Sequence, residues 1–324
     1  MAISINKQKY RDFCKTENDL PIFSQDWWLD TVCGPDNWNV IVIENGNNII
    51  ATMPYYQKVK FGLNCLIMPK LTQNLGPYIK YPPGQKYSTR LSYQKKILNQ
   101  IIEQLPKYHH FSQSFHYMIT NWLPFYWKGF TQTTRFTYTI DLSQGLETLW
   151  ENVDKSYRNK ISKASKILSV RDDLPIEDFY TVNSKVYQRQ NIKNRYTLNF
   201  VKKLDAILVE KNCRKIFYTV DNMNRIHSAA YLVWDKRSSY MLMSGADPIL
   251  RQSGSGTLLN WEAIKFSCIK LDLRCFDFEG SMIEGVENRC RSFGAIQTPY
   301  SHIQKTLSKL MLLKRALNQI MRSY

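Results

Sequence analysis

Short strand-forming segments alternate with amphipathic helical segments along the whole 324-residue chain. The strand candidates are short apolar or alternating runs, and the helical candidates repeat apolar residues every three or four positions. The turn-like segment 44–47 separates two strand candidates, Trp38–Ile43 and Asn48–Met53, which predicts a β-hairpin. A chain with this pattern buries its apolar faces by packing helices on a sheet, so we expect a mixed α+β fold.

Both halves of the chain show this mixed pattern over similar lengths, and 324 residues are enough for two hydrophobic cores. The pattern restarts near Gly145, where a new run of helices begins. We therefore expect two domains of one duplicated and diverged fold, 1–144 and 145–324. The expected elements outside the hairpin are helices at Trp27–Val32, Ser92–Leu105, Leu146–Asn152, Ser156–Leu168, Phe179–Gln190, Leu198–Glu210, Thr257–Ile269 and Glu284–Arg291, a closing basic helix from about Gln304, and strands at Tyr117–Ile119, Phe136–Ile140, Lys215–Val220, Ser228–Trp234, Ser239–Ser244 and Arg274–Phe278.

The charge of the chain is concentrated in three places. Lysine and arginine number 44 against 27 acidic residues, which gives a formal net charge of +17. Three stretches without an acidic residue, 155–171, 185–203 and 304–324, hold six, six and five basic residues and account for the whole excess. Such a localised excess predicts a binding face for an anionic partner, either nucleic acid, anionic lipid or a phosphorylated ligand. Solvated helix faces are the alternative.

The cysteines, the histidines and the start of the sequence exclude several classes of protein. The seven cysteines are odd in number and scattered, and the five histidines show no metal-ligand spacing, which predicts reduced thiols and no structural metal. The sequence starts with MAISINKQKYRDF, without the apolar core of a secretory leader, and has no apolar run long enough for a membrane span. We therefore expect a cytoplasmic protein.

The segment Arg251–Gly256, with the sequence RQSGSG, lies between a strand candidate and the helix candidate Thr257–Ile269. Small consecutive residues expose backbone N–H groups there, and the helix N-terminus adds positive potential, so the turn can cradle phosphate oxygens. It is neither a Walker loop nor a three-glycine dinucleotide-binding loop. In this context R-x-x-G-x-G resembles the pyrophosphate loop of GNAT-type N-acyltransferases. That resemblance implies coenzyme A bound by Arg251, Ser253, Gly254, Ser255 and Gly256. A plain strand-to-helix turn is the alternative.

Several further motifs accompany this loop, and most of them lie close to it. They are Phe276–Ser281, Ile283–Glu287, Arg291–Ala295, Thr298–Tyr300, Tyr157–Ala164, Trp27-Trp28 and Leu75–Pro77. Together they closely resemble the FemAB-like (FemABX) family of acyl- and aminoacyltransferases, over nearly the whole chain. Two departures are the pair Arg289-Cys290, where the family often has aromatic residues, and the lack of room for the long helical arm of some members.

The resemblance implies two tandem GNAT-like domains, the first of them degenerate, with the acceptor bound at their junction. Members transfer an aminoacyl group from aminoacyl-tRNA, or an acyl group from a thioester, to an amine of a cell-wall precursor or another envelope molecule. We expect acyl-CoA, such as acetyl-CoA, as the donor because the glycine loop is retained. Aminoacyl-tRNA, which would make the chain a peptidoglycan interpeptide-bridge transferase, is the alternative. The implied acceptor is a phosphorylated or lipid-linked molecule, met in the cytoplasm or at the inner face of the membrane.

Two carboxylates at the end of the strand candidate Arg274–Glu279 are the candidate catalytic groups. Attack of an amine on a thioester needs a neutral amine, a polarised carbonyl and a proton for the leaving group. Asp277 and Glu279 share one face of the strand, and Glu279, nearer its end, is the candidate general base. Either carboxylate could instead cap the helix that starts near Glu284. Tyr300 is a candidate for protonating the leaving group or binding substrate, with packing as the alternative.

Side chains of the first two basic stretches are candidates for binding substrate. On the helix candidate Ser156–Leu168 the apolar residues share one face and the basic residues lie opposite. The candidates for binding phosphate or the acceptor are Arg158, Lys160 and Lys163 on this helix, and Arg195 and Tyr196 in the second stretch. His227 is expected to be structural. No Ser-His-Asp or Cys-His arrangement follows from the spacing, so a covalent acyl-enzyme is not expected.

A non-catalytic module is the competing interpretation. A degenerate pair of GNAT-like domains would use its basic faces to hold RNA or an anionic membrane. The C-terminal basic stretch could anchor such a module on a membrane, because apolar residues accompany its five cations. Packing on a domain is the other use of those residues, which are Leu307, Leu310, Met311, Leu317 and Met321.

Overall fold

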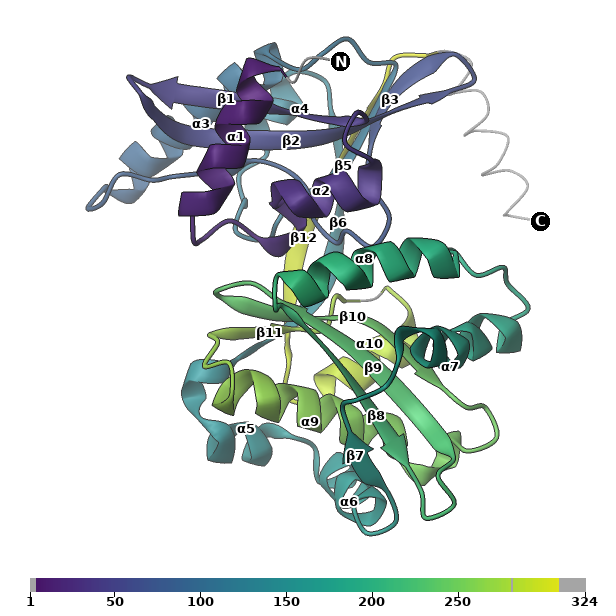
Figure 1. Cartoon of the computed structure of the whole chain (residues 1–324). Helices are drawn as coiled ribbons and strands as arrows, with labels where there is room; N and C mark the ends of the chain where they lie inside the picture. The colour runs from purple at the N-terminus through teal and green to yellow at the C-terminus, as the bar shows by residue number, and fades with distance from the viewer. Residues whose placement is uncertain (1–3, 281, 309–324) are drawn as a thin grey trace, which may run out of the picture. The chain divides into compact units, whose positions relative to one another are not determined.

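The computed structural model describes residues 4–280 and 282–308 of the chain, which separates into two compact units (Figure 1). The first unit combines the residues up to Arg135 with those from Pro299 onward, and the second unit is Phe136–Thr298. The sequence instead predicts one boundary at 144/145. The difference arises because residues 139–141 pair with a strand of the second unit, while residues 302–306 pair with a strand of the first.

The sheet of the first unit follows the order β1-β2-β3-β5-β12, with β4 pairing to β2. β3 and β5 run parallel, and the other pairs are antiparallel. The strands are β1 (Trp38–Asn45), β2 (Asn48–Lys60), β3 (Leu63–Ile67), β4 (Tyr78–Ile79), β5 (His110–Ser114) and β12 (Ile296–Thr306). The predicted hairpin is confirmed, and β2 extends seven residues beyond its expected end at Met53.

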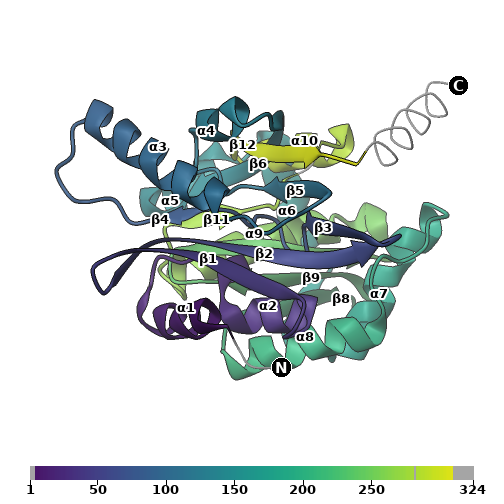
Figure 2. The same cartoon turned by 90° about the horizontal axis from the view of Figure 1, so that it is seen from above.

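Helices cover both faces of the β1–β2 hairpin, because β1 is apolar on both sides. Ile41 packs with Ile97 of α3 in one core, while Trp38 contacts Tyr10 of α1 on the other face, with 6.1 Å between ring centroids. Figure 2 shows α1 and α2 on one side of the hairpin and α3 and α4 on the other. These helices are α1 (Ile5–Thr16), α2 (Asp26–Cys33), α3 (Tyr87–Glu103) and α4 (Leu123–Trp127), with a short 3-10 turn at Ile22–Ser24.

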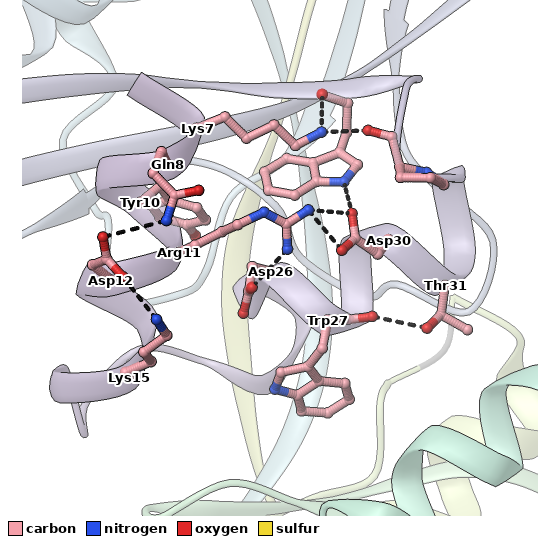
Figure 3. A network of polar contacts seen from close by, with 12 residues as sticks. Lys7, Gln8, Tyr10, Arg11, Asp12, Lys15, Asp26, Trp27, Asp30 and Thr31 are labelled. Carbon is pink, nitrogen blue, oxygen red and sulfur yellow. Dashed lines mark hydrogen bonds and ion pairs between the residues drawn. The ribbon is translucent and has the colours of Figure 1, made fainter. Parts of the chain in front are cut away.

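An ionic network joins α1, α2 and β1 (Figure 3). The Arg11 guanidinium lies 2.9 Å from Asp26 and 2.8 Å from Asp30, and the Trp38 indole N–H donates to Asp30 at 2.8 Å. Lys7 donates to the Trp38 carbonyl oxygen at 3.0 Å, and burial lowers the pKa of this lysine against the opposing charge of Asp30. The network therefore fixes both N-terminal helices to the edge strand of this unit.

The second unit is built on a sheet in the order β6-β11-β10-β9-β8-β7. β10 and β11 run parallel, whereas β11 pairs antiparallel with β6, and β10, β9, β8 and β7 pair antiparallel in succession. The central strand β9 is buried on both faces, since Tyr231 contacts Phe179 of α7 while Leu232 belongs to the core that α9 covers. The strands are β6 (Thr131–Asp141), β7 (Ser169–Arg171), β8 (Arg214–Val220), β9 (Ile226–Trp234), β10 (Ser238–Ala246) and β11 (Cys275–Asp277). The helices are α5 (Leu146–Asn152), α6 (Lys155–Ala164), α7 (Ile176–Arg189), α8 (Leu198–Glu210), α9 (Ser255–Ile269) and α10 (Glu284–Arg291).

The expected mixed α+β fold is confirmed, and three predicted helices, those of α5, α8 and α10, have the bounds that the structure gives. The predicted strand at Tyr117–Ile119 is wrong, because the strand lies earlier, at β5. The predicted closing helix from Gln304 is also wrong at its start, since residues 304–306 belong to β12. Its remainder beyond residue 308, with four of the five apolar anchor candidates, lies outside the described residues. Within the described ranges, no helix combines the length and apolarity that a membrane crossing needs.

Candidate functional site

A tight left-handed turn follows β11 and carries the candidate base. Glu279 and Gly280 have φ angles of +55° and +47°, a region that residues other than glycine rarely adopt. A Cβ on Gly280 would lie 2.3 Å from the carbonyl oxygen of Phe136, so glycine is required where this turn meets β6. β11 ends at Asp277, so Glu279 lies beyond the strand. The prediction that these two carboxylates share a strand face is therefore wrong.

Asp277 holds the turn in place. Its side chain is fully buried, and Oδ1 accepts hydrogen bonds from the Thr137 hydroxyl and, at 2.7 Å, from the backbone N–H of Glu279. α10 begins at Glu284 without a side-chain cap, so neither carboxylate caps that helix. These contacts make Asp277 a positioning residue for Glu279, and its direct part in catalysis stays a prediction.

Glu279 carries a buried carboxyl group. The residue as a whole is half-buried, but its Oε1 is buried and has no hydrogen-bond partner within the described part of the chain. Burial raises the pKa of Glu279 well above the ordinary value of 4.5, and the charge of Asp277 raises it further. A carboxylate with a raised pKa is a stronger base, and an oxygen without a protein partner is available to a bound substrate. Glu279 is thus suited to accept a proton from an amine.

Tyr196 lies near this carboxyl group, in the loop between α7 and α8. Burial raises the pKa of Tyr196 to about 12, and the charges of Tyr187 and Glu279 add to the rise. The Tyr180 hydroxyl donates to the Tyr196 carbonyl oxygen at 2.9 Å and so fixes the loop to α7. Tyr196 and Glu279, both candidates from the sequence, are therefore close enough to interact electrostatically. Tyr180 and Tyr187 were missed, although their spacing of seven residues puts both on one face of a helix.

The glycine loop has the strand–loop–helix context that the sequence predicts. A short 3-10 turn, Arg251–Ser253, leads to Gly254 with φ +77°, and α9 begins directly afterwards without a side-chain cap. A Cβ on Gly254 would lie 3.3 Å from the carbonyl oxygen of Lys160, so the loop packs closely on α6. A Cβ on Gly256 would meet nothing within 4 Å, and the Ser255 hydroxyl is buried without a hydrogen-bond partner among residues 4–280 and 282–308. The first turn of α9 thus offers uncapped N–H groups beside open space.

The loop is anchored to β9 through Ser253. The Ser253 hydroxyl donates to the Leu250 carbonyl oxygen at 2.8 Å and lies 2.9 Å from His227 Nδ1, while His227 Nε2 lies 3.2 Å from Asp221. Burial opposes ionisation of Asp221, but hydrogen bonds from Arg225 and His227 outweigh it and hold the pKa of this carboxyl far below its usual range. The spacing of these residues in the sequence does not reveal this contact between a serine, a histidine and an aspartate. The Ser253 hydroxyl is nevertheless committed to a carbonyl oxygen, which suits an anchor better than a nucleophile.

The basic residues of α6 have different contacts. The Arg158 guanidinium donates to the carbonyl oxygens of Trp150 and Glu151, at 3.2 Å and 2.7 Å, and so caps the end of α5. The Lys160 ammonium lies 4.6 Å from the centre of the Tyr157 ring, and Lys163 is exposed in the last turn. The role of Arg158 in phosphate binding stays a prediction, and its observed contacts are structural. The α6 backbone at Lys160 adjoins the glycine loop, and a role of Lys160 and Lys163 in phosphate binding stays a prediction.

Arg195 and Tyr300 are the two remaining candidates from the sequence. Arg195 is exposed beside Tyr196, and its charge lowers the pKa of Tyr187 against the effect of burial. Tyr300 lies in the part of β12 that belongs to the first unit and is half-buried, and its role stays a prediction. Among the described residues, no group of three or more histidine, cysteine or carboxylate side chains is arranged to hold a metal ion.

Comparison with known proteins places this site in a recognised domain. Residues 151–287 match the family model described as an acetyltransferase (GNAT) domain. The second unit is a GNAT domain. This domain contains α6, the glycine loop and Glu279. A search of curated proteins by sequence gives no match.

Solved structures extend the similarity to the whole chain. A crystal structure of FemX has a TM-score of 0.65 and 12% sequence identity, and the match covers 93% of this chain and 97% of that one. A tandem GNAT protein from the clavulanic acid biosynthesis pathway has a TM-score of 0.55 at 9% identity, covering 94% and 95%. The C-terminal domain of a putative lysylphosphatidylglycerol synthetase from Agrobacterium fabrum has a TM-score of 0.55 at 8% identity, and the match covers 97% of this chain and 96% of that one. The chain therefore shares the fold of FemX and of a tandem GNAT protein, which confirms the fold that the FemAB-like resemblance implies, and its GNAT domain makes it a transferase of the acyltransferase class.

Proposed function

We propose that the chain is an N-acyltransferase that moves an acyl group onto an amine of a cell-envelope or glycan precursor. The observation that carries this proposal is the buried Glu279 carboxyl group, which has a raised pKa and an oxygen without a protein partner, inside a GNAT domain. A module that only holds RNA or membrane has no use for such a group, whose burial is unfavourable to the fold. The catalytic interpretation therefore accounts for a feature that the non-catalytic one leaves unexplained.

The glycine loop fits a coenzyme A donor. Gly254 takes a left-handed conformation, Gly256 leaves open space at the first turn of α9, and no side chain caps that helix. Backbone N–H groups of residues 254–256 would hold the pyrophosphate, and Lys160 and Lys163 on the adjoining helix would add positive charge. When bound, acyl-CoA supplies a thioester carbonyl that is activated toward attack by an amine. Aminoacyl-tRNA is the alternative donor, supported by the basic stretches that flank the loop in the sequence.

Glu279 would prepare the acceptor amine. An amine is mostly protonated at neutral pH and must lose a proton before it can attack a carbonyl group. The raised pKa of Glu279 brings the pKa of this carboxyl group closer to the pKa of an ammonium group. Proton transfer from the amine to Oε1 therefore becomes less unfavourable. Asp277 keeps the turn, and hence the carboxyl group, in position, and Tyr196 would contact the acceptor. Tyr300 remains the candidate for returning a proton to the leaving group.

The acceptor class is argued from charge and from the structural neighbours. Residues 155–171 and 185–203 each hold six basic residues without an acidic one, and both belong to the second unit. Positive charge of this kind favours a phosphorylated or lipid-linked acceptor. One of the structurally similar proteins is named as the C-terminal domain of a putative lysylphosphatidylglycerol synthetase, and the lipid part of that named product carries a phosphate group. We therefore place the reaction in the cytoplasm, with acceptors reached at the inner face of the membrane.

Calorimetry with acetyl-CoA tests the donor, and Gly256→Asp sharpens the test. A carboxylate at the start of a helix is favourable to folding, so this variant should stay folded. It would repel a phosphate about 5 Å away by roughly 1–3 kcal/mol and should weaken acetyl-CoA binding by about tenfold or more. Gly285→Asp is the matched control, because it adds the same charge to the first turn of α10 in open space. No binding by the unmodified chain at millimolar acetyl-CoA would remove the coenzyme A donor.

Glu279→Gln tests the base. The variant keeps the shape of the side chain, so acetyl-CoA should bind as before. Turnover, followed as free thiol released in the presence of amine acceptors such as amino sugars and amino acid amides, should fall by about 10²–10⁴-fold. Turnover close to that of the unmodified chain would end the assignment of Glu279.

A further inference from the structure

The β2–β3 hairpin of the first unit ends in a two-residue turn, Phe61-Gly62. We name the segment Lys58–Leu63 the hairpin tip. Lys60 pairs with Leu63 across the turn, and the two turn residues have φ angles of +51° and +73°. Two successive left-handed residues are the pattern of a type I′ turn, for which Asn-Gly is the favoured sequence. Phenylalanine is therefore an unfavourable choice for the first turn position.

The strained phenylalanine contributes little to the core. Phe61 is 86% exposed and Val59, two residues earlier, is 62% exposed. A bulky residue at positive φ is a conformational outlier, and such strain is retained where it serves a function. Most of the Phe61 side-chain surface is therefore open to solvent. Its placement at the outermost point of a hairpin points to a contact with something outside the chain.

The surroundings of the hairpin tip are apolar and basic. Backbone hydrogen bonds link Asn64 of β3 to His109, and His109 to Leu307, at 2.8 Å each, which brings Leu307 beside the hairpin. Leu307 is 55% exposed. Three exposed lysines, Lys58, Lys60 and Lys107, belong to the same segments. The segments 58–64, 107–109 and 305–308 contain no aspartate or glutamate.

We propose that the hairpin tip docks the first unit on an anionic lipid bilayer. Phe61 and Val59 enter the boundary between headgroups and acyl chains, while the lysines lie at the lipid phosphates. A bilayer suits these observations better than a protein partner, because the protruding apolar side chains are far fewer than the roughly 20–30 residues per side of a stable protein interface. This inference does not depend on the identity of the donor or the acceptor, and it uses residues outside the candidate active site.

The substitution Phe61→Asn separates membrane binding from folding. Asparagine is favoured at this turn position, so the variant should unfold at the same or a higher urea concentration than the unmodified chain. Sedimentation of the full chain with vesicles of phosphatidylcholine, and of phosphatidylcholine mixed with phosphatidylglycerol, measures lipid binding. The unmodified chain should bind the anionic vesicles, and Phe61→Asn should reduce that binding about tenfold, as expected from the loss of one buried phenylalanine side chain. Met223→Asn is the matched control, since Met223 is 67% exposed in a hairpin turn of the second unit, and it should bind as before.

The lysines test the electrostatic part of the proposal. Lys58→Gln combined with Lys60→Gln should weaken binding to the anionic vesicles by about fivefold for each lysine, and added salt should weaken the unmodified chain further. Equal binding to the two kinds of vesicle, no binding to either, or unchanged binding by Phe61→Asn would each overturn the proposal. The last result would also be obtained if another part of the chain, such as residues 309–324, carried the lipid contact.

Discussion

Gly280→Ala should weaken the fold and displace the candidate base at the same time. A methyl group at this position would lie 2.3 Å from the Phe136 carbonyl oxygen and 2.4 Å from the Thr137 Cα, both of them backbone atoms that cannot rotate away. The φ of +47° adds about 1–2 kcal/mol of strain for a residue with a Cβ, and relieving the overlap adds about 1–3 kcal/mol. We expect a loss of about 2–5 kcal/mol in the free energy of unfolding, which leaves most domains folded.

Urea unfolding of the Gly280→Ala variant measures this loss, and turnover measures its effect on the site. A displacement of Glu279 by about 1 Å should reduce turnover by about 100-fold. Gly285→Ala is the matched control, because its new methyl group meets nothing within 4 Å inside α10 and should add about 0.5–1 kcal/mol of stability. A loss below about 1 kcal/mol for Gly280→Ala, with an unchanged denaturant slope, would refute the close approach of this turn to β6.

Further predictions concern the pH dependence of stability and turnover, and the polar contacts of Ser253 and Asp30. Because the folded-state pKa of Glu279 is raised, the stability of the unmodified chain should fall as the pH rises from about 4.5 through that pKa, and Glu279→Gln should remove this fall in urea titrations. Turnover should fall as the pH drops through the same pKa, and a flat profile would contradict a basic role. Ser253→Ala should weaken acetyl-CoA binding and lower the free energy of unfolding by about 1 kcal/mol, because His227 loses a hydrogen-bond partner. An unchanged acetyl-CoA affinity in calorimetry would exclude a role of Ser253 in anchoring the glycine loop. Asp30→Asn should lower the free energy of unfolding by about 1–2 kcal/mol through Arg11 and Trp38, whereas a loss within error would show that the network adds no stability.

The sequence predicts elements well where the signal is local. The helix Leu198–Glu210 has a clear apolar stripe and a threonine cap, and its predicted and observed bounds agree. β5 was missed because its sequence, HFSQS, is polar, and its serines are satisfied by a distant strand. The Ser114 hydroxyl lies 2.9 Å from His302 Nδ1, although 188 residues separate them. A local pattern cannot report a partner that only the tertiary fold supplies.

The candidate site also combines features that have a local sequence signal with features that depend on tertiary contacts. The RQSGSG loop was predicted because its small residues and the following helix are contiguous in the sequence. The contact of Ser253 with His227 was missed because these residues lie on different elements, 26 positions apart. The left-handed conformation of Glu279 was also missed, since it depends on how closely the turn at Gly280 approaches β6.

The return of β12 to the first unit determines the order in which the chain can fold during synthesis. The second unit is one continuous segment, Phe136–Thr298, and all of it emerges from the ribosome before the part of β12 that belongs to the first unit. Until residues 302–306 emerge, β5 lacks its antiparallel partner and presents an open edge with unpaired N–H and C=O groups. The N-terminal unit, although translated first, is therefore completed last, and a truncation after Thr298 would leave the whole second unit attached to an unfinished first unit.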